Sequence, residues 1–422
     1  MPLSEMSLLS RKSLAHVNTD DPFIRSSCVY TMSSCMILVV VFFVVLPGAL
    51  IPYFKKVRYL AEVPRIEDQA RSTPSDGFGP LTLCQVEIRS FSRPSPWSYS
   101  PEYIPVDLCS HAVFNVEGLR DWFNDMLNYD MYQSAIRPLF FSFMQDLRKR
   151  QPSIQVYVAV GTFTNLTTAM GSVASSSRDT VPHFARNVLR WTLGNRIDGV
   201  LFGGMFPTAP DRRNAMVKLL KKTGTLFRVQ RTKLGIIVPS TADVFGLRGS
   251  GKKLSSFVDL VIVPAYREAP PTKHRGILSM QQSIEILLNS GIPSRKIIVG
   301  VVFHGSLHQV SKKPFVPQMN ATFKELPYYE VCQWVRDGGW DHMLDMDTLS
   351  AYAHKSNVWV NFDDRHSLAL KADLIRNSSL GGMMAWDISL DDYRGVCGLP
   401  YPLLTAMHDQ LLLGSMSNVS IV

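Results

Sequence analysis

Eight short apolar segments recur along this chain from residue 81 onward, and they constrain its fold more than any other feature. Each segment is nearly continuous in large apolar residues, which is typical of strands that are buried on both faces of a parallel sheet. Stretches with helical spacing separate most of them, and one such stretch places Met216, Leu219, Leu220 and Thr223 on one helix face. The apolar segments occupy residues 81–86, 111–116, 155–160, 198–202, 233–238, 258–263, 296–302 and 382–386.

This alternation predicts one large α/β domain. Eight strand–helix units over roughly 340 residues are typical of a (β/α)8 (TIM) barrel, which we place at residues 81–414. The last two segments are much farther apart than the others, so we expect a small α+β insertion at residues 306–380, between strands seven and eight. Residues 415–422 are then a short C-terminal tail.

A different signal lies near the N-terminus. No charged residue occurs between Arg25 and Lys55, and residues 37–46 are all large and apolar. A membrane-spanning helix needs ~20 apolar residues, so we predict a transmembrane signal anchor at residues 32–54, a cytoplasmic tail at 1–31 and a stalk at 55–80. A cleaved signal peptide, which would make the protein secreted, is opposed by the long polar region before the segment. A buried core helix is opposed by the lack of any polar face.

The glycosylation sequons suggest an orientation for this anchor. Asn165, Asn320, Asn377 and Asn418 each begin an Asn-X-Ser/Thr sequon, and all four follow the apolar segment. The Lys and Arg residues that flank the segment are nearly balanced and lean slightly the other way. We therefore expect a single-pass protein whose large domain is extracellular or lumenal.

Composition narrows the possible functions. The chain is 46% apolar with a net charge of +9, which excludes a disordered polypeptide. No Cys/His cluster has the spacing of zinc ligands, and neither a P-loop nor a Gly-rich dinucleotide fingerprint occurs. We expect no metal and no cofactor.

Several blocks in the domain are similar to those of one enzyme family. They are Asp-Leu-Cys-Ser-His-Ala at 107–112, Tyr-Tyr-Glu-Val-Cys at 328–332, Val-Trp-Val-Asn-Phe-Asp at 358–363, and the segment 381–392. Over 81–414 the chain resembles the glycoside hydrolase family 18 chitinases. The resemblance implies the barrel with its insertion, and disulfides that join Cys84 to Cys109 and Cys332 to Cys397. Disulfides require an oxidising compartment, in agreement with the sequons.

The chain departs from that family at the catalytic motif. Members carry Asp-Gly-x-Asp-x-Asp-x-Glu on the fourth strand, where the Glu protonates the leaving oxygen. Here Asp198 remains, Leu201 and Gly203 replace the inner acids, and Met205 stands at the proton-donor position. A thioether cannot donate a proton, and general acid catalysis contributes ~10²–10⁴ in rate. We therefore predict a pseudoenzyme, unless Asp387 or Glu117 supplies a relocated acid.

The resemblance also implies a glycan site at the mouth of the barrel. Trp386 matches the tryptophan on which a sugar ring stacks in the family, although core packing is an alternative role. Phe163 and Tyr266 would extend that aromatic wall. Arg267 replaces an acid, His304 replaces a tyrosine, and Asp387 follows Trp386 directly.

Charge gives two further expectations. Loss of the inner acids, together with Arg267 and His304, would leave the mouth neutral or basic and favour an anionic glycan over chitin oligomers. The basic run Arg212–Lys233 is either a solvated helix face or a site for a protein or heparin-like partner. Nucleic acid is not expected to bind a lumenal domain. The sequence thus predicts an inactive chitinase-like glycan-binding protein; the alternatives are a protein-interaction or developmental factor with a vestigial barrel, and a hydrolase of altered mechanism.

Overall fold

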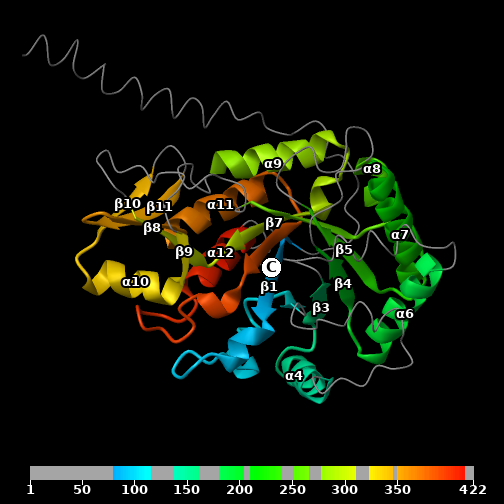
Figure 1. Ribbon diagram of the computed structural model, residues 1–422, viewed down its shortest axis with the longest axis horizontal. Coiled ribbons are helices and arrows are strands. Elements are labelled where there is room, and N and C mark those ends of the chain that lie inside the picture. The colour runs from blue at the N-terminus through cyan, green and yellow to red at the C-terminus, as the bar shows by residue number, and fades with distance from the viewer. Residues whose placement is uncertain are drawn as a thin grey trace, which may run out of the picture. The chain divides into compact units, whose positions relative to one another are not determined.

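The computed structural model describes residues 79–115, 137–160, 180–203, 210–238, 251–265, 277–309, 323–345 and 349–413. Eight parallel strands close into a barrel in the order β1-β13-β7-β6-β5-β4-β3-β2 (Figure 1). Each overlaps one of the eight predicted apolar segments, so the predicted barrel is confirmed. The strands are β1 (Leu81–Glu87), β2 (His111–Asn115), β3 (Gln155–Val160), β4 (Gly199–Phe202), β5 (Lys233–Ile237), β6 (Leu260–Pro264), β7 (Ile297–Val302) and β13 (Gly382–Trp386).

Alternate residues of these strands point to opposite sides of the barrel wall. One set fills the barrel interior and forms a compact apolar group, which we call the inner cluster. The other set, such as Val200 and Phe202 on β4, packs outward into the larger core beneath the helices. The inner cluster consists of Leu83, Val113, Tyr157, Ala159, Leu201, Ile237, Leu260, Ile262, Ile298, Val302, Met384 and Trp386.

Helices cover the outside of the barrel (Figure 1). In α7 the residues Met216, Leu219, Leu220 and Thr223 are buried, as their spacing predicts. The described helices around the barrel are α4 (Arg137–Arg150), α6 (Thr180–Gly194), α7 (Pro210–Val229), α8 (Gly251–Ser255), α9 (Ile277–Asn289), α11 (Arg365–Asn377) and α12 (Pro402–Leu412). Short 3-10 turns lie at η2 (Ile88–Ser92), η3 (Pro101–Tyr103), η5 (Ser294–Lys296) and η6 (Ile388–Leu390).

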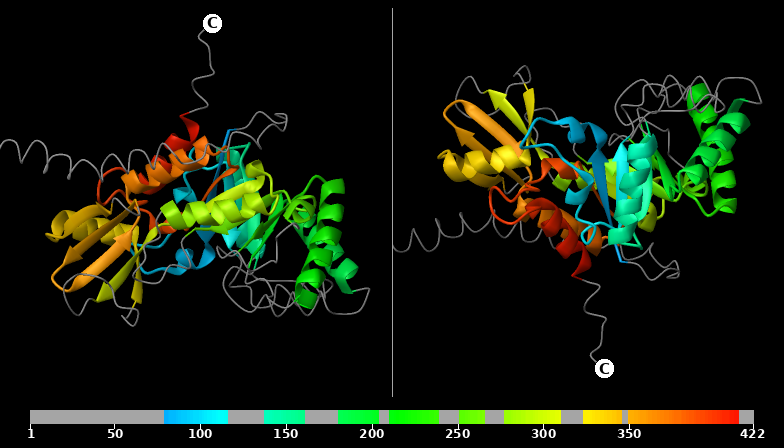
Figure 2. Two further views of the ribbon diagram at one scale, coloured as in Figure 1. Left: turned by 90° about the horizontal axis from the view of Figure 1, so that it is seen from above. Right: turned by 90° about the horizontal axis from the view of Figure 1, so that it is seen from below.

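A separate antiparallel sheet lies between β7 and β13 in the sequence. Its order is β10-β11-β12-β8-β9, and α10 (Tyr328–Asp337) packs on the face that carries Leu326, Ala351 and Val360. Both views in Figure 2 place this sheet at the opposite end of the barrel from α6 and α7. The predicted insertion at 306–380 contains most of the sheet, and it also contains α11, which packs against α12 and β13. The strands are β8 (His304–Gln309), β9 (Phe323–Pro327), β10 (Asp341–Asp345), β11 (Ser350–Lys355) and β12 (Val358–Phe362).

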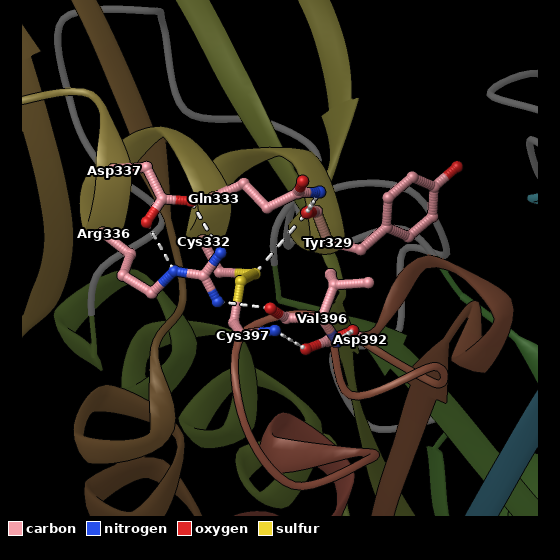
Figure 3. A network of polar contacts seen from close by, with 8 residues as sticks. All are labelled: Tyr329, Cys332, Gln333, Arg336, Asp337, Asp392, Val396 and Cys397. Atoms are coloured by element: carbon pink, nitrogen blue, oxygen red, sulfur yellow. Dashed lines mark hydrogen bonds and ion pairs between the residues drawn. A yellow bond between two sulfur atoms is a disulfide. The ribbon is translucent and has the colours of Figure 1, made fainter.

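Both predicted disulfides are present. Cys84 of β1 is joined to Cys109 before β2, across 25 residues of chain. Cys332 of α10 is joined to Cys397 in the loop after β13, across 65 residues. Figure 3 shows the polar contacts around this second bond, where Asp392 accepts hydrogen bonds from the backbone N–H groups of Val396 (2.8 Å) and Cys397 (2.7 Å). This bond ties the insertion to the barrel.

Several predicted features lie outside the described residues. They include the predicted anchor at 32–54, the tail at 1–31, nearly all of the stalk at 55–80, and the sequons at Asn165, Asn320 and Asn418. Within the described ranges, no helix has the length and apolarity needed to cross a membrane. Asn377 is exposed at the end of α11, and its side-chain amide donates a hydrogen bond to Asp373 (3.1 Å).

Candidate functional site

The carboxyl ends of the eight parallel strands meet at one rim of the barrel, the place where (β/α)8 proteins carry their chemistry. We call this the carboxyl rim and the opposite end the amino rim. The residues that end the strands at the carboxyl rim are Glu87, Asn115, Val160, Phe202, Ile237, Pro264, Val302 and Trp386.

The middle of the degenerate motif lies inside the barrel. Leu201 of β4 stands where the family has its first inner acid, and its side chain is fully buried in the inner cluster. The space that a Cβ atom on Gly235 would need is already taken, since that atom would lie 2.4 Å from a methyl carbon of Leu201. Gly203 is also buried, and its backbone N–H donates to the carbonyl of Val160 (2.8 Å). The interior at these two positions is apolar and holds no carboxylate.

Asp198, the one acid retained from the motif, lies at the amino rim. Its carboxylate accepts a hydrogen bond from the backbone N–H of Val156 (2.7 Å) and pairs with Arg148 (2.8 Å). Asp259 has the equivalent role two strands further along the barrel, where it accepts from the backbone N–H of Leu234 (2.9 Å) and approaches Lys233 (3.7 Å). The contacts of Asp198 therefore connect strand ends, at the end of the barrel opposite to the carboxyl rim.

Trp386 ends β13 at the carboxyl rim, Asp387 follows it directly, and a cis peptide bond joins the two residues. Trp386 belongs to the inner cluster and is only 5% exposed. The Asp387 carboxylate is equally buried and is held by the N–H (2.8 Å) and hydroxyl (2.7 Å) of Ser389, with Arg93 at 3.6 Å. Burial raises the pKa of Asp387 above its ordinary value, and the Ser389 hydrogen bonds and Arg93 oppose this rise. Asp387 thus caps the short turn η6, and its two oxygens are occupied by that role.

Two polar residues at the same rim were missed by the sequence analysis. Glu87 ends β1, and its carboxylate accepts a hydrogen bond from the Asn115 side chain at the end of β2 (2.9 Å). Burial, followed by the nearby charge of Asp387, raises the pKa of Glu87. The predicted strand stopped one residue short of Glu87, and the inward alternation of Leu83 and Gln85 would have identified the next inward position.

Gln85 lies deeper on the same inward-facing row. It is 1% exposed, and its side-chain oxygen has no hydrogen-bond partner within the described ranges of the chain. An unpaired buried acceptor costs about 1–3 kcal/mol. Such a group in the wall of the barrel, two residues from Glu87, is a natural contact point for a donor on a bound molecule.

Of the remaining predicted site residues, His304 is described and the others are not. His304 begins β8, immediately after the carboxyl end of β7, and its ring nitrogen lies 3.5 Å from the Glu325 carboxylate. Phe163, Met205, Tyr266 and Arg267, together with Glu117, lie outside the described residues. The structure therefore brings together Trp386, Asp387, Glu87, Asn115 and Gln85 at one side of the carboxyl rim.

One group of potential metal ligands occurs among the residues that the structure describes, and it consists of Cys332, Asp392 and Cys397. Both of these cysteines are held in the disulfide. A metal would need their thiolates, so this group does not form a metal site.

Comparisons with known proteins agree with this architecture. The model of the family "Glycosyl hydrolases family 18" matches residues 90–391, well over half of the chain. The chain therefore belongs to this family. Among its relatives, an "Endochitinase" of Manduca sexta is 25% identical over 377 residues, covering 78% of this chain and 67% of that protein. A "Probable chitinase 10" of Drosophila melanogaster is also 25% identical, but the chain spans only 16% of its length.

The fold also matches a solved structure of a family member. Human YKL-39, described as a pseudo-chitinase with retained chitooligosaccharide binding properties, superimposes with a TM-score of 0.65 at 20% sequence identity. The match covers 79% of this chain and 99% of YKL-39. At that identity the likeness shows the shared barrel and insertion.

Proposed function

We propose that this protein is a non-hydrolytic member of the family that binds a neutral chitooligosaccharide at its carboxyl rim. The observation that carries the proposal is Leu201, a fully buried leucine at an inner-acid position. A carboxylate there would be surrounded by the inner cluster, where an isolated charge is strongly disfavoured. The interior has been rebuilt as apolar packing around this site.

Loss of hydrolysis follows from several changes that act together. Met205 offers no proton at the donor position, and neither Leu201 nor Gly203 offers a carboxylate to orient the substrate's N-acetyl group. Asp387 is an unsuitable replacement because its carboxylate is buried and engaged by Ser389 and Arg93. The other described carboxylate with a raised pKa at this rim, Glu87, is on β1 and accepts a hydrogen bond from Asn115. Neither carboxylate is at the proton-donor position of the motif, so a hydrolase of altered mechanism is the weakest alternative.

Binding has more support than catalysis. Gln85, Glu87 and Asn115 form a row of amide and carboxylate groups on β1 and β2, and Trp386 lies on the neighbouring strand β13. Hydroxyl and N-acetyl groups of a sugar could use these donors and acceptors. The loss of catalysis with retention of oligosaccharide binding is also the property stated for YKL-39.

The charges at the carboxyl rim favour a neutral ligand over an anionic one. Glu87 was not considered in the sequence argument for a basic mouth, and it adds a carboxylate there. The described basic side chains near this rim each have a carboxylate close by, since Arg89 acts on Glu87, Arg93 lies near Asp387, and the His304 ring lies near Glu325. This balance supports chitin oligomers as the ligand at the rim.

A second function is worth testing because Trp386 is almost completely buried. A tryptophan that is part of the inner cluster has little surface left for a sugar ring. This favours the alternative in which the barrel is a platform for a protein partner and its rim is vestigial.

We also propose an extracytoplasmic location. The two disulfides and the exposed sequon asparagine Asn377 support it. The signal anchor at 32–54 stays a prediction from the sequence. An increase in the gel mobility of the full chain after N-glycosidase treatment would test the extracytoplasmic location. Retention of the chain in membranes after carbonate extraction would test the anchor.

The deciding experiment uses the full chain purified from a secretory host. Titration calorimetry with the tetrasaccharide GlcNAc4 measures binding, and mass spectrometry of the same mixture measures cleavage. Binding without cleavage is the expected result. Cleavage would overturn the loss of catalysis, and the absence of binding would support the protein-platform alternative.

A further inference from the structure

A strongly cationic surface lies on the outside of the barrel, away from the carboxyl rim. Two neighbouring helices, α6 and α7, pack against each other and carry exposed Lys and Arg residues. We call the set the basic face. It consists of Arg186, Arg190, Lys218, Lys221, Lys222 and Arg228.

Helix geometry explains why these side chains share one surface. In α7 the residues Met216, Leu219, Leu220 and Phe227 are buried, and the cations occupy the opposite side at helical spacing. At 1.5 Å per residue the row from Lys218 to Arg228 is ~15 Å long. Arg186 and Arg190 are one turn apart on α6, and packed helices have axes ~8–10 Å apart. The cations therefore form two rows, as a linear ligand would need.

The basic face carries little compensating negative charge. Within the described ranges, no ion pair involves any of the six cations. Arg228 donates to the carbonyl of Ser256, and Lys221 lies over the Phe257 ring (5.9 Å). The nearby carboxylates Asp198 and Asp259 are engaged with Arg148 and Lys233.

The next helix along the chain, α8, adds further positive charge beside the basic face. Lys252 and Lys253 of α8 are both exposed, and α8 packs against α7. Like charges brought this close repel one another and lower stability. A surface that keeps them without carboxylate partners is suited to an anionic ligand with many charges.

We infer that the basic face binds a linear polysulfated polysaccharide. Charge complementarity requires a polyanion, and the compartment limits which polyanions are present. The proposed extracytoplasmic location, on which this inference rests, is supported by the two disulfides, and nucleic acid is not an expected partner there. The anionic leaflet of the cell membrane faces the cytosol. Sulfated polysaccharide is the remaining abundant class of polyanion on the extracytoplasmic side.

This surface is separate from the proposed oligosaccharide site. In the closed barrel, β4 lies opposite β13, and α6 and α7 are the helices that precede and follow β4. Trp386 and Gln85 are on the β13–β1 side. Both ligands could therefore bind at the same time, and the two proposals can fail independently.

The test measures binding of the full chain to heparin by biolayer interferometry at several NaCl concentrations. We expect wild-type binding that weakens as salt rises. The variants Lys218→Glu/Lys222→Glu and Arg186→Glu/Arg190→Glu should each weaken it about tenfold or more, because like charges then face the sulfates. Binding of GlcNAc4 should not change in either variant, and the melting temperature should not fall, because the like-charge repulsion is reduced.

A matched control distinguishes an effect of where the charges lie from an effect of the net charge of the protein. Lys324→Glu/Arg365→Glu changes the net charge by the same amount, at exposed positions on the insertion side of the molecule. We expect this variant to bind heparin within about twofold of wild type. Equal weakening in the control and the α7 variant would overturn the proposal. So would equal binding to desulfated heparin, or binding to phosphatidylserine vesicles without binding to heparin.

Discussion

The two rims of the barrel differ in how their polar side chains are partnered. At the amino rim, Asp198 and Asp259 bind backbone N–H groups of the neighbouring strand and pair with Arg148 and Lys233. At the carboxyl rim, the family's acids are replaced, and Gln85 has a buried oxygen without a partner in the described chain. The motif that begins at Asp198 on the amino rim thus continues into the barrel interior at Leu201 and Gly203, where no acid remains.

The difference shows which section of the motif the fold requires. Asp198 contributes to strand connection, so the barrel depends on it whether or not any reaction takes place. Leu201 stands only three residues further along, yet it occupies a position where the family's carboxylate serves chemistry. Once the chemistry is lost, apolar packing at that position stabilises the barrel by removing a buried charge.

The strongest test of this contrast restores an acid. Leu201→Asp should lower the free energy of unfolding by about 3–5 kcal/mol, because it places an uncompensated carboxylate in the inner cluster. Urea denaturation of the full chain measures the change. Leu201→Asn has the same shape without the charge and should cost less. If Leu201→Asp were as stable as wild type, the interior would have to admit water or a counter-charge, and the argument from packing would fail.

The amino rim also predicts a dependence of stability on pH. Burial lowers the pKa of His111 from 6.5 to about 4, while Asp198 opposes this shift. Between those two values His111 binds a proton in the unfolded chain but not in the folded chain, so the contribution of His111 to stability falls as the pH falls. The full shift corresponds to about 3 kcal/mol.

The comparison variant for this prediction is His111→Phe. It keeps a ring against Tyr157, whose ring lies 4.9 Å from that of His111 in an edge-to-face arrangement. Stability of the variant, followed by urea denaturation from pH 7 to pH 4, should fall less steeply than that of wild type. Identical slopes would mean that His111 titrates normally in the folded state.

The next effect is smaller and lies at the same rim. Asp198→Asn should lower the free energy of unfolding by about 1–2 kcal/mol, since it weakens the bonds to Val156 and Arg148 at a carboxylate that is partly exposed. GlcNAc4 binding should be unaffected. Asp259→Asn, at the more exposed equivalent position, should cost less. A loss of ligand binding in Asp198→Asn would contradict the separation of the two rims.

Most of the barrel could be predicted from the sequence because buried parallel strands leave continuous apolar segments. All eight strands were located, and the cysteine pairs followed from the family resemblance. The roles of single side chains were predicted less well than the strands. Glu87 was missed because the strand was ended at Val86, and the sequence alone placed Asp198 in a catalytic motif although its contacts are structural.

The sequence pattern could not show whether a side chain at the carboxyl rim binds a ligand or packs in the core, and the reason is physical. Whether Trp386 stacks on a sugar or packs in the core depends on what fills the barrel interior, and that filling comes from eight separate strands. Leu201, for example, belongs to one apolar cluster with Tyr157, Ile237 and Met384, which come from three other strands.

The smallest expected effect on stability belongs to a variant that tests how the carboxyl rim contacts its proposed ligand. Gln85→Leu removes a buried oxygen that has no described partner, so the free energy of unfolding should stay the same or rise by about 1 kcal/mol. If Gln85 contacts the sugar, the affinity for GlcNAc4 should fall about tenfold in calorimetry, which no structural role would produce in a variant of unchanged stability. The variant Glu87→Gln, which keeps a hydrogen bond to Asn115 possible, should bind nearly as wild type. If Gln85→Leu binds the oligosaccharide normally, then Gln85 does not contact the sugar, and the ligand must be held by other residues of the carboxyl rim.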